Sequence, residues 1–91
     1  MPSRTVTLPN PTGLHARPAK VFASAVADSG HQVRLTKGDT TVNARSVLSV
    51  LTLDCHQGDE VTIDVEGDDA DAVLESLVAL VESGLGEDGT R

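Results

Sequence analysis

The sequence predicts an α+β fold, an open-faced two-layer sandwich in which a four-stranded, mainly antiparallel sheet carries helices on one face. Short segments whose hydrophobicity has a period of two alternate with amphipathic segments in the order βαββαβα. Each predicted strand is apolar on one side only, so a single layer of helices can cover the sheet. At 91 residues, the chain has room for one core.

The first strand and the first helix are separated by a loop that is rich in turn-forming residues. The strand is predicted at 5–8, where polar and apolar residues alternate, and the loop at 9–13 contains two prolines and a glycine. A helix follows from Ala16 to Ala27, with Pro18 in its first turn and Gly30 just beyond its end. Its apolar residues recur at steps of three and four: Ala19, Phe22, Ala23 and Val26.

The next two strands are predicted to form a hairpin, and a fourth strand follows later in the chain. Polar and apolar residues alternate at 32–36, residues 37–40 are typical of a turn, and residues 41–43 are predicted to form the returning strand. The clearest strand is 60–66, where the period of two is strict.

A final helix is predicted to run to Val81, with Asp68 or Asp69 as its cap. Its predicted buried stripe consists of Val73, Leu74, Leu77, Val78 and Val81. We expect one domain over residues 1–85 and a frayed C-terminal tail at 86–91, where little can be buried.

Composition excludes several classes of function. Aromatic content of 1% and a net charge of −7 leave neither the stacking side chains nor the basic surface that nucleic-acid binding needs. The lone Cys55 favours a reducing compartment, and no apolar run approaches the ~20 residues of a membrane span. We therefore expect a cytoplasmic monomer that binds no nucleic acid and does not insert into membranes.

The charge is unevenly distributed along the chain. Residues 1–45 hold six basic and two acidic residues, net +4, whereas residues 46–91 hold one basic and twelve acidic residues, net −11. One interpretation is two faces of opposite charge, one of which receives an anion or an acidic partner. The other is that the acids only solubilise one helix and the tail.

The strongest candidate site surrounds His15. The loop at 9–13 delivers this residue to the start of a helix, where N–H groups such as those of Ala16 and Arg17 lack partners and attract anions. Arg17 adds a cation whose planar guanidinium suits phosphate. Because imidazole is a nucleophile, the arrangement favours a histidine that accepts a phosphoryl group and holds it reversibly. The alternative is a surface histidine that serves only as an N-cap.

Other chemistry finds less support. His15, His31, His56 and Cys55 show no paired ligand spacing, so no metal site is predicted, and His31 and His56 are expected to be solvated surface residues. Cys55 is expected to be a small buried residue. No nucleophile elbow indicates a hydrolase.

Residues 46–53 are predicted to form a short helix with Ser46 as its N-cap, although so short an apolar run also fits a strand. As a helix, it is expected to turn Leu48 and Leu51 inward and to leave Val47 and Val50 at least partly exposed. Exposed aliphatic side chains beside His15 would form a docking surface for a partner, although scattered surface apolar residues are also normal.

Three segments together resemble the histidine-containing phosphocarrier protein (HPr) family of the bacterial phosphoenolpyruvate-dependent sugar phosphotransferase system. They are Asn10–Ala19 (NPTGLHARPA), Val42–Leu48 (VNARSVL) and Gln57–Ile63 (QGDEVTI). The resemblance extends from Val6 to about Glu82, and GLHARPA at this distance from the N-terminus is the family's signature. It implies the βαββαβα sandwich.

The resemblance also implies roles for the site residues. His15 would take a phosphoryl group on Nδ1 from phosphorylated enzyme I and pass it to a histidine of an enzyme IIA domain. Arg17 matches the family's mobile phosphate-site arginine. The protein would then be a carrier within a relay that needs no cofactor, and not a stand-alone enzyme.

Further implied partners act through the short helix. Ser46 matches the serine that a dedicated kinase phosphorylates in many Gram-positive relatives, so a serine kinase/phosphorylase and a transcriptional regulator join the implied partners. Enzyme I and enzyme IIA would dock on Val47–Leu51, with the basic Lys20 at the rim of that surface. The chain departs from its relatives at Asp54, where they usually carry glycine, and this adds a charge near the docking surface.

Two other functions stay open. One is a regulatory module of the same fold that transfers no phosphoryl group, although such a module would have no need of His15. The other is a carrier that serves a nitrogen-related or dihydroxyacetone-kinase branch instead of sugar uptake.

Overall fold

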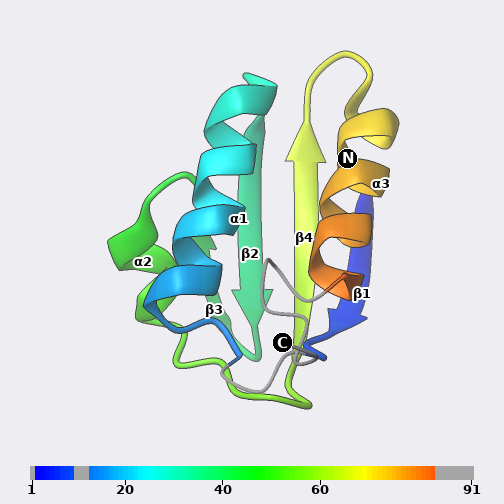
Figure 1. Cartoon of the computed structure of the whole chain (residues 1–91). Coiled ribbons are helices and arrows are strands. Elements are labelled where there is room, and N and C mark those ends of the chain that lie inside the picture. Colours follow the sequence, from blue (N-terminus) through cyan, green and yellow to red (C-terminus); the bar gives the residue numbers. More distant parts are fainter. Residues whose placement is uncertain (1, 10–12, 84–91) are drawn as a thin grey trace.

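The computed structural model describes residues 2–9 and 13–83, and these confirm the predicted fold class and element order (Figure 1). The elements are β1 (Ser3–Thr7), α1 (Ala16–Ser29), β2 (Gln32–Lys37), β3 (Thr40–Asn43), α2 (Val47–Leu51), β4 (Glu60–Glu66) and α3 (Ala70–Glu82). Within these residues, no helix has the length and apolar character needed to cross a membrane. The predicted tail at 86–91 lies outside the described residues.

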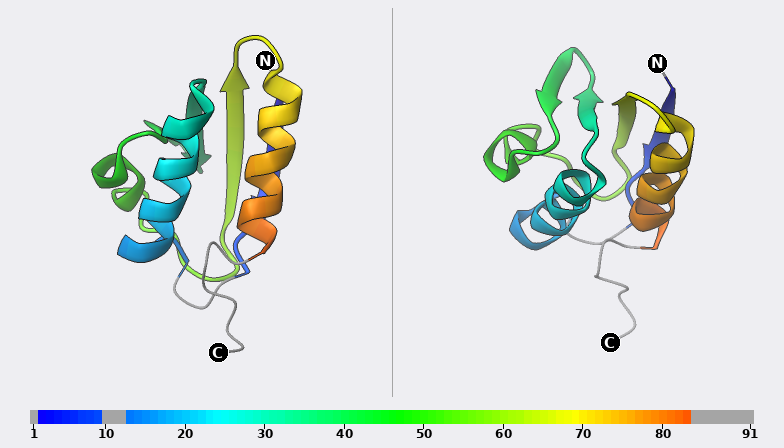
Figure 2. Two further views of the ribbon diagram at one scale, coloured as in Figure 1. Left: turned by 45° about the horizontal axis from the view of Figure 1, so that its top comes forward. Right: turned by 90° about the horizontal axis from the view of Figure 1, so that it is seen from above.

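The strands form one sheet in the order β1-β4-β2-β3, and each neighbouring pair is antiparallel. Helices α1 and α3 lie side by side across one face of this sheet (Figure 1). Helix α2 lies against α1 near the β3 edge (Figure 2). The arrangement places the start of α1 close to the segment that connects α2 to β4.

Strand β4 shows how the period of two builds the core. Val61, Ile63 and Val65 are at most 1% exposed and face the helices, whereas Thr62 lies on the half-exposed side of the same strand. Phe22, the only aromatic residue of the chain, fills the space between α1 and the sheet at 1% exposure. The predicted apolar stripe of α1 is confirmed as buried: Ala19, Phe22, Ala23 and Val26.

The C-terminal end of α1 and the N-terminal end of α3 have different caps. Gly30 ends α1 in the left-handed conformation (φ 72°) and donates its N–H to the carbonyl oxygen of Ala27 at 3.2 Å, as predicted. Asp69 precedes α3, but its carboxylate makes no capping hydrogen bond. Its backbone is left-handed (φ 61°), whereas a capping side chain needs an extended backbone to reach the helix N–H groups.

The predicted buried stripe of α3 is wrong at one residue. Val73 is half-buried, although the sequence predicted it to be buried.

The choice of helix over strand for the short apolar run is confirmed. Ser46 is the N-cap of α2, and its hydroxyl oxygen accepts the N–H of Ser49 at 3.2 Å. The Ser46 backbone is extended (φ −98°, ψ 115°), as an N-cap requires.

The predicted orientation of α2 is wrong. Val50 is fully buried and Leu48 is 77% exposed, while Val47 and Leu51 are half-buried. The reason is that Val50 and Leu53, three residues apart, both enter the core and so fix the rotation of the helix. Leu48 therefore points to solvent.

Candidate functional site

His15 occupies the N-cap position of α1, with an extended backbone (φ −77°, ψ −172°). Its carbonyl oxygen accepts the N–H of Ala19 at 2.8 Å, which begins the helix. Its imidazole makes no capping hydrogen bond and is exposed. The structure therefore shows an exposed histidine at the N-cap, and its ring takes no part in capping.

The loop that carries His15 is fixed against the segment between α2 and β4. The N–H of Leu14 donates to the carbonyl oxygen of Cys55 at 3.2 Å, and the Leu14 side chain is buried. Gly13 has a left-handed backbone (φ 62°), and a Cβ there would lie 2.3 Å from the same carbonyl oxygen. Only glycine permits this approach of the two backbones, so the position of His15 depends on Gly13.

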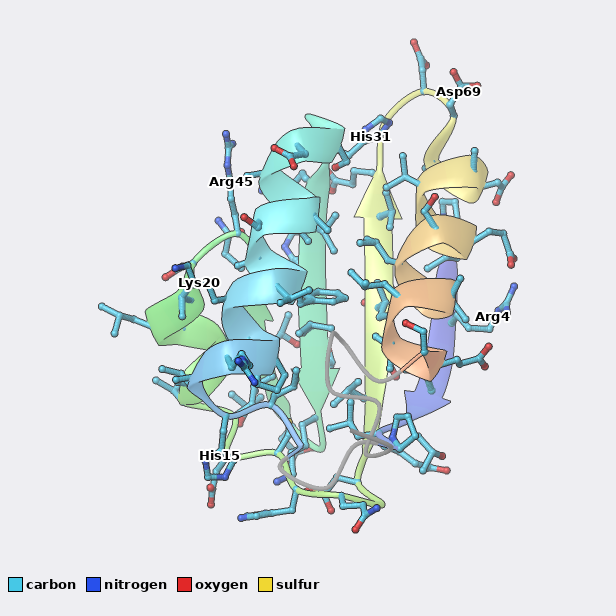
Figure 3. The ribbon with its side chains drawn as sticks, viewed as in Figure 1. Arg4, His15, Lys20, His31, Arg45 and Asp69 are labelled. Carbon is cyan, nitrogen blue, oxygen red and sulfur yellow. The ribbon has the colours of Figure 1, made fainter. Side chains whose placement is uncertain are left out.

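The helix start next to His15 offers donors for an anion. Ala16 and Arg17 have N–H groups without an acceptor inside the helix, and Pro18 has none. The Arg17 side chain is exposed and forms no ion pair with another described residue. Lys20 lies one turn further along α1 and points toward the side where α2 packs (Figure 3). The structure thus places the predicted residues His15, Ala16 and Arg17 together at the start of α1, with Lys20 further along the same helix.

A small hollow of about 60 Å³ adjoins the imidazole. It is lined by Leu14, His15, Leu51, Asp54 and Cys55. Its apolar residues come from the α1 loop and from α2, and its one carboxylate comes from Asp54. The Asp54 backbone is left-handed (φ 52°), a conformation that favours glycine but that aspartate tolerates. The hollow has room for a small polyatomic group beside His15.

A second histidine lies next to His15. The ring centroids of His15 and His56 are 6.3 Å apart, with 64° between the ring planes. His56 is exposed, as predicted, but the sequence did not indicate that it would adjoin His15. The two residues are far apart in the chain, and only the contact between their loops brings them together.

Lys37 is another residue whose role the sequence did not reveal. At the end of β2, its ammonium group donates to the carbonyl oxygens of Leu53 at 3.2 Å and Asp54 at 2.8 Å. It also pairs with Asp59 at 3.2 Å. Lys37 therefore holds the segment that leads to His56. The sequence did not indicate these contacts, because it only placed Lys37 in the turn between two strands.

Two titratable groups in this segment are perturbed. The backbone N–H of His56, followed by the ammonium group of Lys37, lowers the pKa of Asp59 below 3.8. Burial raises the pKa of the Cys55 thiol above 9.0, so the thiol stays protonated and unreactive. The prediction of a buried Cys55 is confirmed. In the described part of the chain, no three His, Cys, Asp or Glu side chains are grouped as metal ligands.

The exposed side of α2 supplies an apolar surface near the site. We call Val47, Leu48 and Leu51 the docking patch; Leu48 is the most exposed of the three at 77%. Val50, predicted to belong to this surface, is excluded because it is buried. Ser46 and the exposed Arg45 precede the patch, and Figure 3 shows Arg45 pointing away from the ribbon.

Comparison with known proteins shows the family of this chain. A family model described as the phosphorylation site of the PTS HPr component matches residues 2–83. The chain belongs to the PTS HPr family. Members of this family carry phosphoryl groups in the phosphotransferase system, so the resemblance drawn from the sequence is confirmed.

Individual members of the PTS HPr family align over almost the whole chain. The phosphocarrier protein HPr of Streptomyces coelicolor is 41% identical over 88 residues, which cover 96% of this chain and 95% of that protein. The phosphocarrier protein NPr of Shewanella violacea is 36% identical, and 92% of each protein is covered. The crystal structure of HPr from Thermoanaerobacter tengcongensis superimposes with a TM-score of 0.90 at 38% identity, covering 96% of this chain and 98% of the other.

Proposed function

We propose that this protein accepts a phosphoryl group from phosphorylated enzyme I on His15 and passes it to enzyme IIA domains for sugar uptake. The observation that carries the proposal is the position of His15 at the N-cap of α1, with its imidazole free of any capping hydrogen bond. Beside it lie the N–H groups of Ala16 and Arg17 and the exposed Arg17 guanidinium, which suit a phosphoryl dianion.

In this mechanism, the lone pair of His15 Nδ1 forms a bond to phosphorus while the proton of the neutral ring stays on Nε2. The bond between phosphorus and the donor atom of enzyme I breaks, and its electron pair remains on that atom. The N–H groups at the helix start and Arg17 stabilise the charge on the phosphoryl oxygens during the transfer. The second transfer repeats these steps with His15 as the donor, so the protein is a carrier and not a stand-alone enzyme.

Partner recognition is assigned to the docking patch and to the basic residues beside it. The aliphatic side chains of the patch would be covered in the complex and would slow its dissociation. Arg17 and Lys20 would steer an acidic partner, and this contribution weakens with salt. The protein would act as a cytoplasmic monomer with a single domain at residues 1–85, and it would use no cofactor.

Ser46 is proposed as a regulatory phosphorylation site for a serine kinase/phosphorylase, with a transcriptional regulator as a further partner. A phosphoserine at the start of α2 would meet unpaired N–H groups, and it would put a dianion at the edge of the docking patch. The second candidate function is a carrier for a branch other than sugar uptake, which the similarity to a protein named NPr favours. It would use the same His15 chemistry.

Incubation with phosphoenolpyruvate and enzyme I, followed by mass measurement, tests the proposed function. We expect one phosphoryl group that is labile to acid and stable to alkali, and we expect none on His15→Ala. Equal labelling of His15→Ala would show that another residue is the acceptor. Subsequent addition of enzyme IIA domains from sugar and non-sugar systems would show which branch removes the label.

A further inference from the structure

The imidazole of His56 lies next to the imidazole of His15, the phosphoryl acceptor proposed above. Its ring centroid is 6.3 Å from that of His15, and the close contact of Gly13 with the Cys55–His56 backbone fixes the two loops together. We propose that His56 is a further phosphate-binding residue, which donates a hydrogen bond from Nε2 to an oxygen of a phosphoryl group on His15. The inference rests on the proposed function of His15.

Two carboxylates face the two nitrogens of the His56 ring. Nδ1 lies 3.6 Å from Asp59, and Nε2 lies 3.5 Å from Asp54. The Asp59 carboxylate is held in place because the same oxygen accepts the His56 backbone N–H at 2.8 Å and pairs with Lys37. Asp59 therefore remains a fixed partner of Nδ1.

Asp54 is the partner of His56 Nε2 that a phosphoryl group could replace. Its side chain is 81% exposed, and its carboxylate makes no ion pair with any other described residue. It also lines the hollow next to His15. A phosphoryl dianion on His15 would repel this carboxylate, which is free to turn into solvent. Nε2 of His56 would then be released toward the phosphoryl oxygens.

The dianion and the ring would also affect each other's charge. A phosphoryl group near His56 favours the protonated ring, and by linkage a protonated ring favours the phosphorylated carrier. The charged groups that face the ring are Asp54 and Asp59, with Lys37 behind Asp59 and His15 across the hollow. The only change at His56 is the uptake of a proton from solvent, while the bond to phosphorus stays on His15.

The test compares wild-type protein with His56→Ala and His56→Gln in equilibrium with phosphoenolpyruvate and enzyme I. We expect His56→Ala to lower the ratio of phosphorylated to free carrier roughly 2- to 5-fold, the range of one exposed charge interaction. His56→Gln, which can donate a hydrogen bond but carries no positive charge, should keep part of the ratio that His56→Ala loses. An unchanged ratio in both variants would overturn the proposal.

Asp54→Asn separates direct binding of the phosphoryl group from simple compensation of the Asp54 charge. If His56 binds the phosphoryl group, His56→Ala still lowers the ratio in the Asp54→Asn background. If the effect of His56→Ala disappears there, His56 only offsets Asp54, and the proposal is wrong. Thermal melting of all variants checks that the fold is retained.

Proton NMR of the His56 ring gives a readout that a purely structural role would not change. On phosphorylation of His15, exchange of the Nε2 proton with water should slow because this proton is donated to a phosphoryl oxygen, and an unchanged exchange rate would contradict the inference. If the wild-type protein takes no phosphoryl group while enzyme I labels a reference carrier, the proposed function itself fails, and this inference fails with it. Normal labelling of His15 without an effect at His56 overturns the inference alone.

Discussion

Arg17 is a residue whose contribution to function can be separated from its contribution to folding. Its side chain is exposed and pairs with no other described residue. Loss of such a side chain usually changes the free energy of unfolding by no more than about 0.5 kcal/mol. Stabilisation of a transferring phosphoryl group by one well-placed donor is worth roughly 100-fold in rate.

We therefore predict that Arg17→Ala lowers phosphoryl transfer to enzyme IIA by about two orders of magnitude and leaves the melting temperature almost unchanged. Rapid-quench measurement of the transfer and thermal denaturation together check this. Arg17→Lys keeps the charge and loses the planar pair of donors, so its rate of phosphoryl transfer should lie between those of the wild-type protein and Arg17→Ala. A loss of stability that matches the loss of rate would indicate a structural arginine.

At the scale of the element, α2 has two sides with different roles. Val50 points into the core and is fully buried, whereas Leu48 is exposed on the opposite side. Burial makes Val50 a contributor to stability, and exposure makes Leu48 available to a partner.

We predict opposite outcomes for two substitutions in this helix. Val50→Ala should destabilise the fold by about 2 kcal/mol, as removal of buried methyl groups does. Leu48→Ser should leave the stability almost unchanged and weaken the binding of enzyme I. Denaturant titration and binding isotherms distinguish the two. If Leu48→Ser bound enzyme I as tightly as the wild-type protein, the docking patch would have no role in this complex.

Ser46 combines the two properties of α2, because it caps the helix and precedes the docking patch. Ser46→Ala should lower the free energy of unfolding by about 1 kcal/mol, because the cap is lost. It should not otherwise change the binding of enzyme I. Ser46→Asp should keep the cap and weaken the binding of enzyme I, because it adds a negative charge beside the surface proposed to bind an acidic partner. Stability and the rate of phosphoryl acceptance over a range of salt concentrations check both variants. Equal rates for Ser46→Asp and wild type at every salt concentration would leave Ser46 as a cap only.

At the scale of the whole molecule, the features that the sequence predicted are those encoded locally. The alternation at 60–66 identifies β4, and the spacing of apolar residues from Ala19 to Val26 identifies α1 and its buried side. The segment around His15 identifies the candidate acceptor. Each of these signals lies within a few consecutive residues.

The features that the sequence did not reveal depend on contacts between distant segments. His56 adjoins His15 only because the backbones of Gly13 and Cys55 touch, and neither residue type indicates that contact. The rotation of α2 was not predictable because four of its five residues are apolar, so either side could be buried. Packing against the core, which buries Val50, decides it.

The two ends of α1 carry histidines with different environments. His15 lies at the first end, and His31 lies beyond the last turn, between that turn and the loop before α3 (Figure 3). Nδ1 of His31 lies 2.9 Å from the carbonyl oxygen of Ser29, and Nε2 hydrogen bonds to the carbonyl oxygen of Asp68. A carbonyl oxygen only accepts, so both ring nitrogens must donate, and only the protonated ring has two N–H groups. His31 is thus predicted to join the end of α1 to the start of α3 in its charged form.

The pH dependence of stability tests this last contact. The hydrogen bond to the Asp68 carbonyl oxygen, followed by the one to Ser29, raises the pKa of His31 above its ordinary 6.5. A raised pKa means that the stabilisation is fully present below pH 6.5 and is lost as the pH rises through the pKa of the folded protein. The melting temperature of the wild-type protein should therefore exceed that of His31→Ala at acidic pH, and the difference should narrow at alkaline pH. Phosphoryl acceptance by His15, at the other end of α1, should be the same in both proteins. A difference in melting temperature that is constant across pH would mean that His31 joins the two segments as a neutral ring.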